Sequence, residues 1–282
     1  MLVAVTDGHP RVLAIWDRKA LPAGPYESGH RSLQAGLREW VERQTHHPLG
    51  YVEQLYTFAD RDRTARAGQH VISISYLGLT REAPADNVQG QWCDWYAYFP
   101  WEDRRCGTPD IITAAITPRL LGWARDDFQL RQRCALNFGL DGQAWNEDLV
   151  LQRYELLFEA GLLPEAGATA PLAGHAMLFD HRRILATAIA RLRAKIKYRP
   201  VVFELMPPTF TLLQLQRCVE AIAGRLVHKP NFRRLMEQQE LVEETGETST
   251  ETGGRPAKLF RFRREVLAER AVAGTKLPLS RA

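Results

Sequence analysis

Hydrophobic and polar positions alternate with a period of two in several parts of the chain. The runs 2–6 and 11–16 flank a stretch that contains Asp, Gly and Pro, so we predict a β-hairpin there. The runs 52–58 and 71–79 are rich in β-branched and aromatic residues, which is typical of strands. The aromatic segment 91–101 is predicted to be a strand that ends at its proline.

Other segments repeat their apolar positions with the helical period. Residues 30–45 and 147–160 are predicted to form amphipathic helices, and the second ends before a glycine. Residues 179–199 form a basic amphipathic pattern, which we interpret as a helix joining two domains and not as a membrane-surface helix. Residues 82–92 and 164–174 are predicted to be loops.

The pattern after Pro207 and Pro208 predicts a helix-turn-helix. The segment 211–224 opens with the spacing of a capping box and stops at a glycine. About five residues later, 229–239 forms a second helix in which Asn231 is predicted to cap and Phe232, Leu235 and Met236 to face inward. Its basic side chains would face outward, where Arg can bind guanine edges or phosphates.

A β-hairpin with glycines near its turn is predicted after the second helix, and a hairpin in this place is a wing. The sequence leaves open whether Arg233 or Arg234 reads a base, since neighbouring residues of a helix point about 100° apart. The candidate DNA-contacting residues are Thr211, Gln214, Lys229, Asn231, Arg233, Arg234, Arg255, Lys258 and Arg261.

The charge distribution supports an acidic partner at the C-terminal end. The net charge of +4 is divided between residues 1–180, with net −6, and residues 181–282, with net +10. Nucleic acid is the commonest partner of such a basic end, whereas the alternative is a solvated basic surface.

Composition excludes some classes of protein. No apolar run is long enough to span a bilayer and no signal pattern opens the chain, so we expect a cytoplasmic protein that needs no membrane. The cysteines form no CxxC pair, and we expect reduced thiols and no metal site. They are Cys93, Cys106, Cys134 and Cys218.

The segment from Gly24 to His46 resembles the Nudix box, the motif whose carboxylates hold Mg²⁺ against a diphosphate. His30 stands where the first Glu of the box belongs, Arg43 where the second residue of a Glu pair belongs, and Thr45 replaces a glycine. The positions that match in register are Gly24, Arg38, Glu39, Trp40 and Glu42.

These departures change the expected chemistry. Mg²⁺ prefers several oxygen ligands, so a His and an Arg in place of two carboxylates make metal-assisted hydrolysis unexpected. A positive site can still hold phosphates. We therefore assign no catalytic residue and no metal ligand. The candidate ligand-binding residues are Arg38, Glu39, Glu42, Arg43, Gln54 and Tyr76.

The alternatives for this region are structural. The box helix could be an ordinary amphipathic helix, Arg38 could be a structural ion-pair partner, and Gln54 and Tyr76 could be scaffold.

Longer stretches resemble the Nudix-related transcriptional regulators of NAD metabolism, the NrtR/NadQ-like type. The resemblance covers residues 1–80 and 179–264, and it includes FELMPPTFTLLQLQRCVEAIAG, KPNFRRLMEQQELVEETGE and GRPAKLFRF in the C-terminal part. Residues 82–175 form an insertion relative to the shorter regulators, which suggests the larger branch that represses NAD biosynthesis genes.

The resemblance implies an α/β Nudix-like sandwich, with a mixed sheet between helices, and a C-terminal α+β winged helix-turn-helix. The sensor domain would span 1–200, with the insertion at 82–175 and a linking helix at 179–199, and the DNA-binding domain would span 201–282. Such proteins act as homodimers on palindromic double-stranded DNA operators and respond to ATP, ADP-ribose or another NAD-related nucleotide. No cofactor is required.

Two rival functions remain at this point. The first is a Nudix-type pyrophosphate hydrolase with an accessory C-terminal domain, which a pyrophosphatase assay with Mg²⁺ would detect. The second is a non-catalytic protein-interaction module with a basic tail, which a DNA gel shift would distinguish from a regulator.

Overall fold

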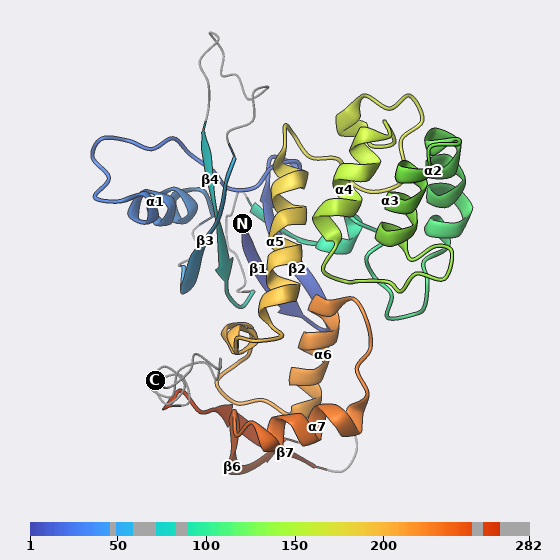
Figure 1. Cartoon of the computed structure of the whole chain (residues 1–282). Coiled ribbons are helices and arrows are strands. Elements are labelled where there is room, and N and C mark those ends of the chain that lie inside the picture. Colours follow the sequence, from blue (N-terminus) through green and yellow to red (C-terminus); the bar gives the residue numbers. More distant parts are fainter. Residues whose placement is uncertain (46–48, 59–71, 83–89, 250–255, 266–282) are drawn as a thin grey trace, which may run out of the picture.

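A mixed five-stranded sheet lies at the centre of the N-terminal half (Figure 1). The computed structural model describes residues 1–45, 49–58, 72–82, 90–249 and 256–265. The strand order is β3-β4-β1-β2-β5, and only the β1–β4 pair is parallel. The strands are β1 (Leu2–Thr6), β2 (His9–Ile15), β3 (Tyr51–Phe58), β4 (Ser73–Leu79) and β5 (Gly90–Asp94).

The predicted N-terminal hairpin is confirmed, and its turn explains it. Thr6 pairs with His9, so the connection is the two-residue turn Asp7-Gly8. Both turn residues have positive φ, 51° and 74°, as a type I′ turn requires. The strand predicted at 91–101 is wrong in its second half. Asp94 ends β5 because its carboxylate accepts a hydrogen bond from the Tyr96 amide at 2.8 Å and opens a 3₁₀ turn.

Helices lie on both sides of the sheet, and most of them are on the side opposite the box helix (Figure 1). The box helix α1 (Leu33–Thr45) begins after Ser32, whose hydroxyl accepts a hydrogen bond from the Ala35 amide. The helix predicted at 147–160 is confirmed as α4 (Val150–Glu159), and the one predicted at 179–199 is α5 (His181–Lys195). The other helices of this half are α2 (Thr117–Ala124) and α3 (Phe128–Phe138).

Helix α5 lies between the sheet and the helices α2, α3 and α4 (Figure 1). A single cluster of buried apolar side chains extends from the sheet past α5 and into the C-terminal half. Fully buried members of this cluster are Leu77, Trp101, Leu157, Ile189 and Ile222. The segments on either side of the proposed boundary near residue 200 therefore share one core.

Two helices and a β-hairpin form the C-terminal half, as predicted. They are α6 (Leu212–Ala223), α7 (Lys229–Gln238), β6 (Val242–Ser249) and β7 (Ala257–Phe262). The capping box of α6 is present, and Gly224 ends the helix with φ +70°. Phe210 pairs with Phe260 of the hairpin through two backbone hydrogen bonds, so the wing is tied to the chain just before α6.

Two predictions about α7 are wrong. His228, and not Asn231, is the N-cap residue. Leu235 is 45% exposed, whereas Phe232 and Met236 are buried, because only these two face α6 and the core. Within the described part of the chain, no helix is long and apolar enough to cross a membrane.

Candidate functional site

A cavity of about 300 Å³ lies behind the box helix. Its walls come from α1, the chain that leads into it, strand β4 and the first turn of α5. Apolar side chains from these elements form much of the wall, and Ser73, Ser75, Asp180 and His181 add polar groups. The mixture of apolar walls and a few polar groups is typical of a small-molecule site.

Trp40 and Gly24 close one side of this cavity. The indole NH of Trp40 donates to the Pro25 carbonyl at 2.8 Å. A Cβ atom at position 24 would lie 2.1 Å from the indole ring, so the glycine of the box permits a close approach of the ring to the backbone. The cavity therefore depends on a matched pair of box residues whose role is packing.

His30, which replaces the first Glu of the box, is held inside the fold. Its Nδ1 accepts a hydrogen bond from the Glu27 amide at 3.1 Å, so the ring presents Nε2–H toward Glu39, 3.4 Å away. A Cβ at Gly36 would lie 2.6 Å from the imidazole, and the ring thus packs directly on α1. This histidine orders the loop before α1.

The charged residues of α1 point away from the cavity or are bound locally. Arg38 donates to the carbonyls of Leu49 and Gly50, the latter at 3.0 Å, so its partners are backbone carbonyls and not the carboxylate of the ion-pair alternative. Arg43 pairs with Glu39 at 2.5 Å and stacks on Trp40. None of these charged side chains, nor the exposed Glu42, lines the cavity.

The two candidates from the sheet differ from each other. Tyr76 lies on β4, is 8% exposed and lines the cavity. Gln54 pairs with it on β3 but is exposed and does not line the cavity. The sequence reasoning missed Trp40 and His181 as lining residues. Trp40 had a signal, because it is the apolar position inside the box, but His181 is 141 residues away from it in sequence.

Metal and thiol chemistry have little support in the described residues. No group of three His, Cys, Asp or Glu side chains within them is placed to hold a metal ion. Burial raises the pKa of the thiols of Cys93 and Cys134, and that of Cys218 to about 12. A thiol with a raised pKa is a poor nucleophile at neutral pH.

The outward face of α7 is the candidate nucleic-acid interface. On a helical wheel Arg234 lies about 180° from the midpoint of the buried pair Phe232 and Met236, whereas Arg233 lies about 80° from it. Both side chains are exposed, as is Lys229 at the start of the helix. The packing of α7 therefore favours Arg234 as the residue that points away from the protein.

The residues Thr211 and Gln214 form the predicted capping box of α6. The Thr211 hydroxyl accepts from the Gln214 amide at 3.2 Å, and the Gln214 side chain accepts from the Thr211 amide at 2.7 Å. Thr211 is only 3% exposed, so it stabilises the helix and cannot contact DNA. Gln214 is exposed, and Asn231 is exposed beside a crevice between α7 and the rest of the protein.

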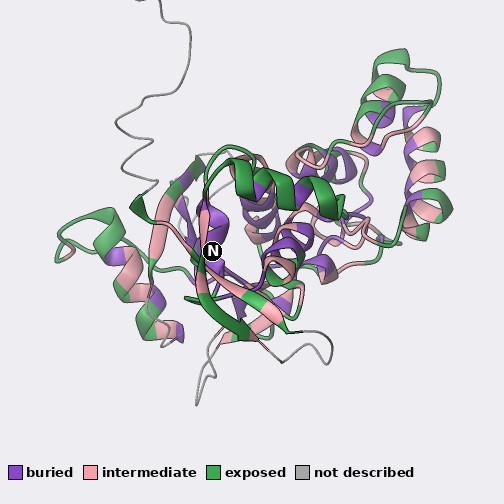
Figure 2. Cartoon of the chain, turned by 90° about the horizontal axis from the view of Figure 1, so that it is seen from below, coloured by how far each residue is buried: buried purple, intermediate pink, exposed green. Residues whose placement is uncertain are grey.

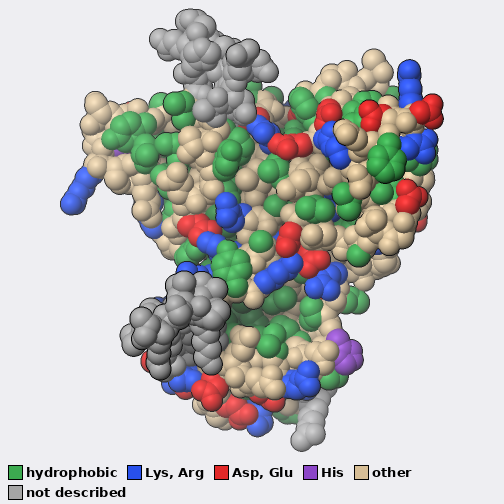
Figure 3. Space-filling model, viewed as in Figure 1, with side chains coloured by type: hydrophobic (Ala, Val, Ile, Leu, Met, Phe, Trp, Pro, Cys, Tyr) green, Lys and Arg blue, Asp and Glu red, His purple; other side chains and the backbone are tan. Residues whose placement is uncertain are grey.

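The wing is less basic than the sequence suggested. Lys258 pairs with Glu244 at 2.8 Å, and Arg261 pairs with Glu243 at 2.6 Å, so strand β6 neutralises the charges of β7. Figure 3 shows acidic and basic side chains side by side on this lower part of the molecule. Arg255, the other predicted wing residue, lies outside the described residues.

Comparison with known proteins identifies the C-terminal part. Residues 202–262 match the family model of the NrtR DNA-binding winged helix domain. The ADPR responsive transcriptional repressor NtrR of Acinetobacter baylyi is 44% identical over 86 residues. These are 30% of this chain and 34% of that protein, so the chain aligns with about a third of the relative's length.

Solved structures resemble the whole chain. Shewanella oneidensis NrtR complexed with a 27mer DNA has a TM-score of 0.54 at 21% identity, and the match covers 95% of this chain and 93% of that one. An Enterococcus faecalis MutT/nudix family protein has a TM-score of 0.56 at 17% identity, with 93% and 83% covered. At these identities the likeness concerns the fold.

The fold and the comparisons together define a Nudix-like domain followed by a winged helix domain. The C-terminal part of the chain is thus similar to the DNA-binding domain of NrtR proteins. The fold class that the sequence predicted is confirmed.

Proposed function

We infer that this protein is a DNA-binding transcriptional repressor of NAD biosynthesis genes, whose Nudix-like domain binds a nucleotide instead of hydrolysing it. The observation that carries this proposal is the match of residues 202–262 to a DNA-binding winged helix, on a helix pair that presents Arg234 outward. The Acinetobacter relative is a repressor, which favours repression over activation.

The effector is an NAD-related nucleotide, with ADP-ribose as the first candidate and ATP as the second. The relative is described as ADPR responsive. The cavity behind α1 has a volume at the lower end of small-molecule sites.

Binding without turnover follows from the charges of the box. Glu39 has Arg43 at 2.5 Å and His30 at 3.4 Å, so its carboxylate already has two partners. A Mg²⁺ ion at Glu39 would displace these partners and still lack the two carboxylates that His30 and Arg43 replace. The domain therefore serves as a sensor in this proposal.

The DNA partner is a palindromic operator bound by a homodimer. A two-fold dimer presents two α7 helices to half-sites about 34–36 Å apart, which is one helical turn of DNA. The effector changes DNA binding only if it binds one arrangement of the two winged helices better than the other.

A mobility shift with the DNA upstream of the protein's own gene tests the proposal. We expect a complex at moderate salt whose affinity changes when ADP-ribose is added, and light scattering should give a dimer. Incubation of ADP-ribose with Mg²⁺ tests the rival hydrolase. Turnover at the common enzyme rate of about 1 per second or faster would establish the hydrolase, and no shift on any upstream DNA would exclude the repressor.

A further inference from the structure

A carboxylate with no role in the cavity or the DNA face lies at the centre of the molecule. Glu102 is 1% exposed and is held between two guanidiniums that are themselves fully buried. Arg153 of α4 donates to it at 2.6 and 2.9 Å, and Arg193 of α5 donates at 2.6 Å. We call these three residues, together with Tyr96, which lies beside Arg193, the Glu102 hub.

The hub is joined to the end of α6, the first helix of the winged helix domain. Arg193 Nε donates to the Ile222 carbonyl at 2.9 Å. Tyr96, whose hydroxyl lies 3.3 Å from Arg193, donates to the Ala221 carbonyl at 2.7 Å. The amide of Arg104 donates to the Gly224 carbonyl at 2.7 Å. These three contacts satisfy carbonyls at and just after the end of α6, where the helix itself supplies no partner.

The net charge of the hub favours its place beside the carboxyl end of α6. One carboxylate and two guanidiniums leave a net positive charge, and the carboxyl end of α6 carries the negative end of its dipole. Burial alone would raise the pKa of Glu102, but Arg153 and Arg193 hold the pKa below its usual value, so the carboxylate stays charged. Removal of one partner from a buried ion pair is strongly destabilising because the other charge is left uncompensated.

The contact between the hub and α6 is also sterically close. A Cβ at Gly224 would lie 2.4 Å from the Glu102 carbonyl and 2.7 Å from the Arg193 guanidinium. The residue has a φ of +70°, which side chains rarely adopt. The close approach at Gly224 therefore fixes the position of the carboxyl end of α6 against the hub.

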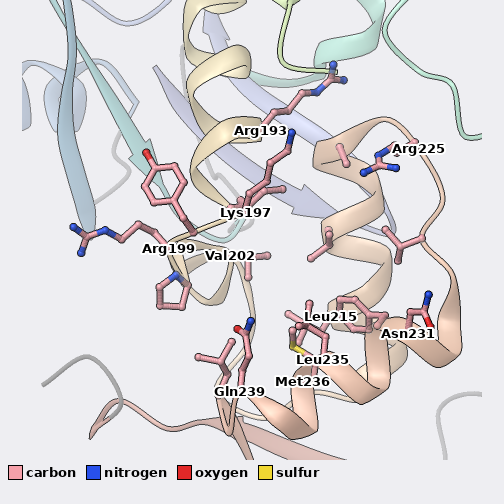
Figure 4. Close-up of a pocket in the computed structure, with 18 of the residues that line it drawn as sticks. Arg193, Lys197, Arg199, Val202, Leu215, Arg225, Asn231, Leu235, Met236 and Gln239 are labelled. Carbon is pink, nitrogen blue, oxygen red and sulfur yellow. The ribbon is translucent and has the colours of Figure 1, made fainter. Parts of the chain in front are cut away.

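The second helix of the pair is held much less. A crevice of about 530 Å³ separates α7 from the chain that follows α5. Figure 4 shows Val202, Leu215, Leu235 and Met236 around this hollow, with the side chains of Arg193 and Lys197 directed away from it toward the rest of the protein. The winged helix domain is thus braced at the end of α6 and open beside α7.

Helix α5 connects this brace to the ligand cavity. In its first turn the Nδ1 of His181 accepts from the Leu21 amide at 2.7 Å, and Ile184 lines the cavity. Arg193 follows about 18 Å farther along the same rigid helix. A shift of α5 at the cavity therefore moves the hub, and with it the carboxyl end of α6.

We propose that the Glu102 hub is the positioning device that fixes the winged helix domain and passes the state of the cavity to it through α5. Glu102, Arg193 and Tyr96 are positioning residues that touch neither ligand nor DNA. The coupling part of this proposal rests on the proposed function, whereas the brace itself does not.

Hydrogen exchange of the full chain without ligand tests the brace. We compare Glu102→Gln and the milder Tyr96→Phe with the control Glu165→Gln, which weakens another buried pair, Glu165 with Arg182 at 3.1 Å, at the opposite end of α5. Residues 212–224 should exchange at least about fivefold faster in both hub variants and unchanged in the control. Tyr96→Phe keeps the test valid if Glu102→Gln does not fold. Unchanged exchange in α6 for Tyr96→Phe would overturn the proposal.

The coupling is tested by the ratio of DNA affinities with and without ADP-ribose. Coupling between two sites is commonly about 5- to 150-fold, so the ratio should fall toward one in the hub variants. It should stay at the wild-type value in Glu159→Gln, which weakens the exposed pair of Glu159 with Arg133 at 2.7 Å, away from α5. The affinity for ADP-ribose without DNA should stay within about twofold of wild type. A wild-type ratio in both hub variants would overturn the coupling. If the wild-type protein binds no DNA, the proposed function fails while the exchange experiment still decides the brace.

Discussion

The helices α1 and α7 carry similar residues but use them differently. In α1 the Arg and Glu side chains bind one another, a histidine or nearby carbonyls, and they face away from the cavity. In α7, Arg233 and Arg234 are exposed and have no ion-pair partner among the described residues. Viewed from below in Figure 2, most of α1 is intermediate or exposed, and its buried residues are Gly36, Val41 and Thr45.

This difference shows that the charged residues of a sequence motif do not by themselves mark the position of a ligand site. The charged positions of the box stabilise α1, and the space for a ligand is made by a tryptophan, a glycine and side chains from other elements. In α7 packing buries Phe232 and Met236 and leaves the charged side chains exposed, so these side chains can contact a partner. Four sets of substitutions test this difference between α1 and α7.

The largest effect is expected on α7. Arg234→Ala should cost about 1–3 kcal/mol of affinity for the operator, which is roughly 5- to 150-fold, and far less on random DNA. Arg233→Ala should cost less, because this side chain lies toward the flank of the helix. Fluorescence anisotropy with both kinds of DNA measures these losses. A larger loss for Arg233 than for Arg234 would reverse the assignment.

The second effect concerns the wall of the cavity. Trp40→Ala removes the indole that closes the cavity against Gly24, so the affinity for ADP-ribose should fall about tenfold, or by 1.4 kcal/mol, as calorimetry would measure. Glu42→Ala is the matched control on the same helix, since its side chain is exposed outside the cavity. Equal losses in the two variants would move the ligand to the outer face of α1.

The third effect is on the wing and is smaller. Lys258→Ala should lower the log–log salt dependence of DNA binding by at most about one unit, equally on all sequences. Because Glu244 holds Lys258 at 2.8 Å, Glu244→Gln should raise DNA affinity by releasing that lysine. Binding titrations at several salt concentrations measure both changes. A decrease of affinity in Glu244→Gln would show that the wing does not bind phosphates.

The smallest effect is expected from the box arginine. Arg43→Ala breaks an exposed ion pair with Glu39, four residues earlier, which contributes only about 0.3–0.5 kcal/mol. Thermal unfolding should change little, and ADP-ribose affinity should stay within about twofold. A tenfold loss of ADP-ribose affinity would return Arg43 to the ligand site.

Several features could be predicted from the sequence because short stretches of chain decide them. The turn Asp7-Gly8, the capping box of Thr211 and Gln214 and the stop at Gly224 each depend on residues within four positions of one another. The departures from the Nudix box are likewise visible without a structure, and they already indicate that the carboxylate set is incomplete.

The sequence itself determined the hairpin, the helix pair with its wing, and the segregation of charge toward the C-terminal end. Which charged side chains remain unpaired and exposed depends on the tertiary structure. Glutamates of β6 neutralise basic side chains of β7. The packing of α7 buries Phe232 and Met236 and directs Arg234 outward. Glu102 pairs with Arg193, which is 91 residues away in sequence. The physical reason is that local patterns depend on backbone geometry, whereas the pairing of a charge depends on which distant segment folds beside it.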